Sequence, residues 1–237
     1  MKLFFAFLIL LTLPLSAERS IELFVALCDN KTQGIAPVGA KIGNGDDAPN
    51  NLYWGCSDGT GSYFKRSQKW NLQATQKPEA KHILETITFK HKTSGVLLTA
   101  HAYRGSNMKK CLEDYFQALK SGGPQKLVGF IGHNGLMDTS PTPPAVAEDD
   151  IAETPTIVLC CISDTYFEPH FSRYRAKPLL LTNQLMYPGA FIFHDAIEVW
   201  LKNGTPDDYL QAAGASYAKN QKISTRAARK IFEAPKQ

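Results

Sequence analysis

Long hydrophobic runs are scarce in this 237-residue chain, since no apolar stretch after residue 17 is long enough to cross a bilayer. Neither sign of charge predominates, because 26 Lys and Arg against 22 Asp and Glu leave a formal net charge of only +4. Much of that charge falls in KNQKISTRAARK, at 219–230, which we interpret as a solvated helix end. We therefore expect no nucleic-acid partner and no stable membrane insertion of the mature chain.

Cysteines are few and lack the C-x-x-C spacing that is typical of zinc sites. His91, His101 and His194 show no metal-ligand spacing with a matching carboxylate, so we predict neither a metal nor another cofactor. The odd number of cysteines leaves at least one thiol without an intramolecular partner. The sequence leaves open whether Cys28 and Cys56 form a disulfide. The five cysteines are Cys28, Cys56, Cys111, Cys160 and Cys161.

The first 17 residues have the pattern of a secretory signal peptide. Lys2 provides a positive start, LFFAFLILLTLPL an apolar core, and Leu15-Ser16-Ala17 a small-residue cleavage site. An uncleaved anchor is the alternative, and the polar residues that follow at 18–20 argue against it. We therefore predict a secreted or periplasmic protein whose mature part, 18–237, forms a single domain.

Apolar strands alternate with amphipathic helices along the mature part. This alternation predicts an α/β domain with a mainly parallel sheet covered on both faces. A long loop at 34–62 is expected to be ordered, because it contains Tyr53 and Trp54. Strands are expected at 21–28, 83–90, 95–104, 126–133, 156–161 and 178–183, and helices at 107–120, 190–204 and from 206 to about 219.

Two of the expected strands end in residues that are capable of chemistry. One ends at His133 and the other at Cys160-Cys161. Parallel strands present their carboxyl ends at one edge of the sheet, where functional residues of open α/β sheets gather. A thiol needs a neighbouring base to become a nucleophile, and histidine is the usual one. A His/Cys dyad is the hypothesis, and an inert core cysteine beside a structural histidine is the alternative.

The residues around both strand ends resemble a known family. VGFIGHNG resembles the His-Gly block, and IVLCCISDTYF the Ala-Cys-x-Ser block, of caspase-like (clan CD-type) cysteine peptidases such as caspases, legumains and gingipains. The resemblance implies a three-layer α/β/α sandwich, with His133 as the catalytic histidine and Cys161 as the nucleophile. Asn30 lies where legumain-like members carry an asparagine that orients the imidazole. Asn134 stands between His133 and Gly135, where the family has His-Gly directly.

The resemblance also implies a mechanism. His133 accepts the proton of the Cys161 thiol, and the backbone N–H after Gly135, or that of Cys161, binds the oxyanion. Asp138 and Asp164 are close to these residues in sequence. Either aspartate is expected to orient the histidine or to bind a basic substrate side chain, with turn capping as the alternative.

Three functions are consistent with these features. The first is an exported caspase-like cysteine peptidase or related thiol hydrolase that acts on a peptide or protein substrate. The second is a catalytically inactive caspase-like domain that serves as a binding or scaffolding module through the 34–62 loop. The third is a disulfide-handling protein that uses Cys160 and Cys161, although adjacent cysteines form a strained ring. We rank them in that order.

Overall fold

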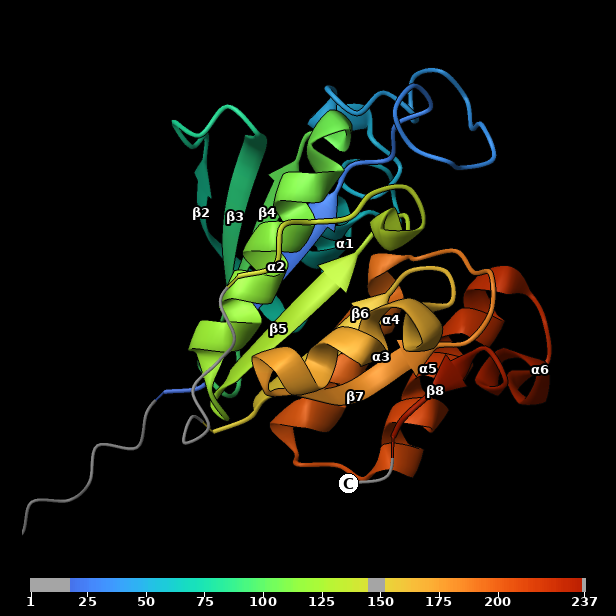
Figure 1. The fold of residues 1–237 in the computed structure, drawn as a ribbon. Helices are drawn as coiled ribbons and strands as arrows, with labels where there is room; N and C mark the ends of the chain where they lie inside the picture. Colours follow the sequence, from blue (N-terminus) through green and yellow to red (C-terminus); the bar gives the residue numbers. More distant parts are fainter. Residues whose placement is uncertain (1–17, 145–151, 236–237) are drawn as a thin grey trace, which may run out of the picture.

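The computed structural model describes residues 18–144 and 152–235, so the predicted signal peptide lies outside the described residues. One eight-stranded sheet with the order β2-β3-β4-β1-β5-β6-β7-β8 forms the centre of the molecule (Figure 1). The five strands from β4 to β7 in this order are parallel, and the flanking strands β2, β3 and β8 are antiparallel. The strands are β1 (Ser20–Ala26), β2 (Trp70–Gln76), β3 (Ile83–His91), β4 (Leu97–Tyr103), β5 (Lys126–Ile131), β6 (Thr154–Leu159), β7 (Ala176–Thr182) and β8 (Phe232–Glu233).

Helices cover both faces of this sheet. Side chains of α2 and α3 belong to one buried cluster, and those of α1, α4 and α5 belong to a second cluster on the other face. The α/β class and the three-layer α/β/α arrangement are therefore confirmed. The helices are α1 (Thr60–Arg66), α2 (Met108–Gly122), α3 (Ser163–Tyr174), α4 (Ala190–Leu201), α5 (Pro206–Gln221) and α6 (Thr225–Arg229).

Strand alternation explains how the sequence fills two cores. In β1, Leu23 and Val25 enter the cluster of α1, α4 and α5, whereas Phe24 and Ala26 enter the cluster of α2 and α3. From Leu23 to Ala26 the strand is apolar because helices cover it on both sides. Helix α2 buries the predicted apolar face, which includes Cys111 and Leu119.

Several details differ from the sequence-based expectations. The expected strand at 156–161 ends at Leu159, so Cys160 and Cys161 follow β6. Strand β2 and helix α3 were not predicted. All five cysteines are free thiols, which leaves Cys28 and Cys56 unbridged.

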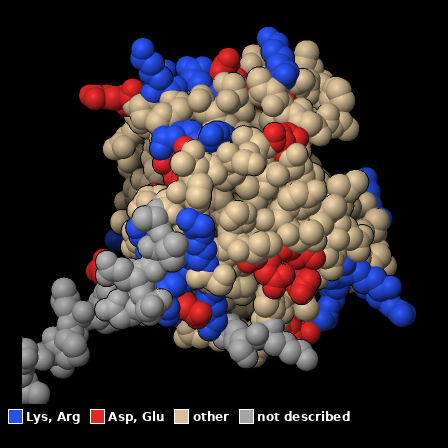
Figure 2. All heavy atoms as spheres, in the orientation of Figure 1, with Lys and Arg blue, Asp and Glu red and all other residues tan. Residues whose placement is uncertain are grey.

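Basic and acidic groups are interspersed on the face of the molecule that Figure 2 shows. In the described parts, no helix combines the length and the apolar character needed to span a membrane.

Candidate functional site

The ends of β5 and β6 meet at one edge of the sheet, as predicted. The two strands are parallel, and their last register pair is Ile131 with Leu159. Both residues belong to the same buried cluster, so both point to the face of α1, α4 and α5. His133 and Cys161 each follow two residues later in the chain. The topology therefore brings the two predicted site residues to neighbouring positions.

Gly132 makes the turn that leads to His133. Its φ is +155°, and an added β-carbon would lie 3.0 Å from the carbonyl oxygen of Ala26. Its N–H donates to the carbonyl of Leu159 at 3.3 Å. A side chain at this position would combine backbone strain with a close contact, so glycine is required here.

His133 is buried, with 7% of its surface exposed, and its partner is Asp138. The ring Nε2 lies 2.7 Å from Asp138 Oδ2, which also accepts the N–H of Gly34 at 2.8 Å. An ionised carboxylate only accepts hydrogen bonds, so Nε2 carries the proton. In the neutral ring, Nδ1 is then the nitrogen with a free lone pair.

Asn134 joins the two strand ends directly. Its side-chain amide donates to the carbonyl of Cys161 at 2.7 Å, and its side-chain oxygen accepts the N–H of Leu136 at 3.1 Å. The latter N–H is the one after Gly135 that was expected to bind an oxyanion. It is already satisfied within the protein, which leaves the N–H of Cys161 as the remaining predicted donor. Gly135 is buried, and an added β-carbon would lie 2.3 Å from Met108.

Cys161 is half-buried, and its sulfur contacts a backbone segment that precedes α4. The N–H of Met186 donates to Sγ at 3.4 Å, and Sγ donates to the carbonyl of Met186 at 3.6 Å. No hydrogen bond joins Sγ to the ring of His133 among the described residues. Cys160, by contrast, packs against α2 and α3, and burial raises the pKa of its thiol well above the ordinary value.

A second thiol and a tyrosine lie on the same side as Cys161. Burial raises the pKa of Tyr53 well above its ordinary value, and nearby Cys28 and Cys161 add to this effect. Burial also raises the pKa of Cys28 to about 11. Both groups therefore remain neutral near pH 7 beside Cys161. Sequence reasoning missed this neighbourhood, because only the folded 34–62 loop brings Tyr53 to the sheet edge.

Two predicted site residues make other contacts. Asn30 donates to the carbonyl of Val38 at 2.8 Å and accepts its N–H at 3.0 Å, so its amide holds its own loop. Asp138 instead makes the contact to the imidazole that was expected of Asn30. Asp164 lies in the first turn of α3 and accepts the N–H of Thr165 at 2.6 Å. Its described hydrogen bonds are to Thr165 and not to the imidazole.

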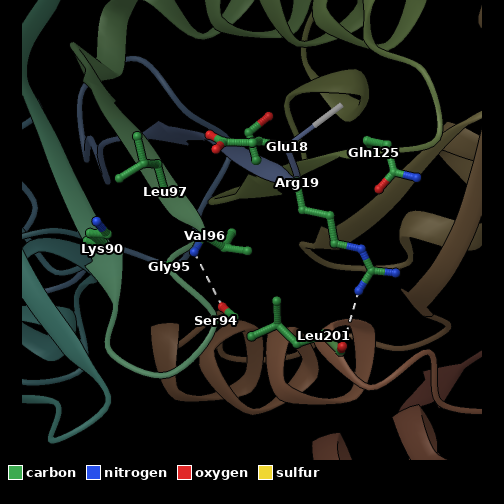
Figure 3. A pocket seen from close by; sticks show the side chains of 10 residues that line it. Glu18, Arg19, Lys90, Ser94, Gly95, Val96, Leu97, Gln125 and Leu201 are labelled. Atoms are coloured by element: carbon green, nitrogen blue, oxygen red, sulfur yellow. Dashed lines mark hydrogen bonds between the residues drawn. The ribbon is translucent and has the colours of Figure 1, made fainter. Parts of the chain in front are cut away.

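A hollow of about 660 Å³ lies at the opposite edge of the sheet, so it is separate from the candidate site (Figure 3). It is lined where β1, β4 and β5 begin, by residues that include Ser20, Leu97 and Gln125.

No family model, curated protein or solved structure matches this chain. The caspase-like resemblance therefore rests on the residues and their placement alone. The function that follows from it is a proposal.

Proposed function

We propose that the chain is an exported caspase-like thiol hydrolase, a cysteine peptidase in which Cys161 attacks the substrate and His133 transfers the proton. The observation that carries this proposal is the parallel pairing of β5 with β6, which sets both residues at one edge of the sheet. Asn134 supports it by joining the peptide of Cys161 to the residue after His133. The substrate would be a peptide or protein.

The reaction needs a base, and the contact between His133 and Asp138 supports Nδ1 in this role. Nδ1 takes the thiol proton while Sγ bonds to the scissile carbonyl carbon. The proton then passes to the leaving amine as the C–N bond breaks, and water hydrolyses the thioester. The carboxylate of Asp138 stabilises the ring cation that forms between these steps.

The hydrogen bonds between Met186 and Cys161 fix the position of the sulfur in the free protein. The same contact directs Sγ toward the backbone of Met186, so attack requires the side chain to rotate away from it. Catalytic hydrogen bonds that are open in the free enzyme often close when substrate binds.

An inactive binding module is the second candidate. The observation that favours it is the missing contact between Sγ and the imidazole among the described residues, together with the burial of His133. In that case the bond between Asp138 and His133 serves to hold the loop at Gly34.

Alkylation followed by peptide mapping tests the proposal, with Cys56 as an internal control. Both Cys56 and Cys161 are half-buried free thiols, but burial and Asp58 raise the pKa of Cys56. We expect iodoacetamide to label Cys161 at pH 7 at least about tenfold faster than Cys56. Cys161→Ala should abolish cleavage of a peptide library, whereas Cys56→Ala should not. Equal labelling and no cleavage by the wild-type protein would favour the binding module.

A further inference from the structure

A second set of polar side chains lies between α1 and α4. The hydroxyl of Ser67 is 2.8 Å from Nε2 of His194, and Nδ1 of the same ring is 2.9 Å from Oδ1 of Asp195. Ser67 directly follows α1, and the other two residues lie in the first half of α4. The three groups are thus in the order hydroxyl, imidazole and carboxylate that activates a serine nucleophile.

The hydrogen bonds have a direction that suits this chemistry. Asp195 accepts from Nδ1, so the lone pair of His194 is on Nε2 and accepts the hydroxyl proton of Ser67. The N–H of Lys69 donates to Ser67 Oγ at 3.1 Å, which leaves the hydroxyl hydrogen for the ring. Tyr63 and Phe64 contact the ring of His194 at centroid distances of 5.4 and 5.5 Å and hold its orientation.

Two other histidines each contact a hydroxyl and a carboxylate. The first, His91, differs from His194 because the ring nitrogen that faces the hydroxyl already accepts another hydrogen bond. His91 Nδ1 lies 2.9 Å from the hydroxyl of Ser94, and its Nε2 lies 3.2 Å from Glu198. The backbone N–H of Ser94 also donates to Nδ1 at 3.2 Å. The lone pair that would accept the hydroxyl proton is therefore already satisfied, so Ser94 is a matched control.

The second histidine, His101, lies on the sheet itself and differs from His194 because its hydroxyl partner is not accessible to a substrate. Thr86 lies 3.0 Å from Nδ1 of His101, whose Nε2 faces Glu22 at 3.3 Å. Thr86 is buried within the pair of strands β3 and β4, with 8% of its surface exposed. A substrate carbonyl could not reach this hydroxyl without opening the sheet.

Ser67, by contrast, opens into a hollow of about 390 Å³, which is large enough for a small ester. The exposed Arg66 lies on its rim, and its side chain donates to the carbonyl of Ser57. Arg66 forms no ion pair with an acidic residue in the described part of the chain. An unpaired guanidinium at this position would attract a carboxylate on the substrate. The hollow is lined by Tyr63, Arg66, Ser67, Gln68, Lys69 and His194.

We infer that Ser67, His194 and Asp195 form a second nucleophilic site that hydrolyses small carboxylate-bearing esters. Ser67 Oγ bonds to the ester carbonyl carbon as its proton moves to His194 Nε2. The leaving alcohol takes that proton when the ester C–O bond breaks, and water then releases the acid and restores the hydroxyl. This site uses neither Cys161 nor His133, so it is independent of the proposed peptidase.

A fluorophosphonate probe and two nitrophenyl esters test the inference in a Cys161→Ala background, which removes the thiol nucleophile. Peptide mapping should find the phosphonyl adduct on Ser67. Ser67→Ala and Asp195→Asn should each lower hydrolysis of mono-p-nitrophenyl succinate by about 100-fold, and Ser94→Ala should leave it unchanged. Arg66→Gln should remove a preference for the succinate over p-nitrophenyl acetate.

Circular dichroism confirms that each variant is folded before its rate is compared. The absence of an adduct on Ser67 in the folded background protein would overturn the inference. Equal rates for Ser67→Ala and Ser94→Ala would do the same.

Discussion

Asn134 donates its side-chain amide to the carbonyl oxygen of Cys161 at 2.7 Å, and Asn134 itself is fully buried. This bond links the chain leaving β5 to the chain leaving β6, immediately beside His133. Asn134 is also the residue that separates His133 from Gly135, where caspase-like peptidases have His-Gly directly. Asn134 thus supplies a contact between the two strand ends.

The contact between Asp138 and His133 predicts how Cys161 will react. Asp138→Asn should slow alkylation of Cys161 at pH 7 by about tenfold or more, because the amide no longer fixes the proton on Nε2 or stabilises the ring cation. Asp164→Asn is the matched control and should have no effect. Peptide mapping by mass spectrometry measures both rates. Equal rates would restrict the role of Asp138 to holding the loop at Gly34.

Replacing Gly132 by a residue with a side chain is expected to destabilise the protein. Gly132→Ala should lower the free energy of unfolding by about 2 kcal/mol, because its φ is strained for other residues and the new methyl group would press on Ala26. Gly39→Ala should be close to neutral, since its β-carbon would meet only Ile42 at 3.8 Å. Urea unfolding compares the two variants. A neutral Gly132→Ala would mean that the turn before His133 adapts.

Glu22 predicts a dependence of stability on pH. Burial alone would raise the pKa of this carboxyl, but hydrogen bonds and charges from His101 and Lys126 lower it from 4.5 to about 2. Since the folded-state pKa lies below the unfolded one, this stabilisation is present above pH 4.5 and is lost as the pH falls toward about 2. Glu22→Gln should therefore lower the free energy of unfolding by about 2 kcal/mol at pH 7 and by little at the acidic end.

Chemical unfolding across this pH range measures the effect. Glu168→Gln changes an exposed carboxylate that forms no ion pair in the described structure, so it should leave the profile unchanged. A parallel shift of the Glu22→Gln profile at all pH values would contradict the linkage.

Arg19 is expected to stabilise the C-terminal end of α4. Its guanidinium donates to the carbonyl of Leu201 at 3.1 Å (Figure 3). It also donates to the carbonyl of Trp200 at 3.2 Å and lies 4.9 Å from the Trp200 ring centroid. Arg19→Ala should lower the free energy of unfolding by about 1–2 kcal/mol, because positive charge and donors stabilise a helix C-terminus. Arg19→Lys should retain only part of this stabilisation, since an ammonium group lacks the planar set of N–H donors of a guanidinium. Full recovery with lysine would assign the effect to charge alone.

The sequence predicted the elements that are apolar because they are buried. β1, β5, β6 and β7 stand out as hydrophobic runs, and α2 shows a clear helical period. β2 was missed because most of its side chains are exposed at the edge of the sheet. α3 was missed because Pro169 lies inside it, although Phe167 and Phe171 on the same helix are buried.

The site was predicted to the level of strand ends and, among its side-chain partners, only for Asp138, one of the two aspartates expected to orient the histidine. Chain order and parallel pairing suffice to bring His133 and Cys161 to one edge. Which of the candidate residues contacts the imidazole depends on how two loops fold back, and this choice has no local signal. The side chain of Asn30 bonds to Val38 instead. Asp138 contacts His133 because a short helical turn is all that separates these two residues in the chain.

The first described strand of the chain lies inside the parallel part of the sheet, with a partner on each side. β1 pairs on one side with β4, from Leu97, and on the other with β5, from Lys126. During synthesis, this largely apolar strand therefore has two open edges until both later partners have emerged. Open hydrophobic edges pair readily with other chains, and pairing between distant segments is slow. Residues 20–26 are consequently expected to be the segment that a chaperone must shield until β5 has emerged.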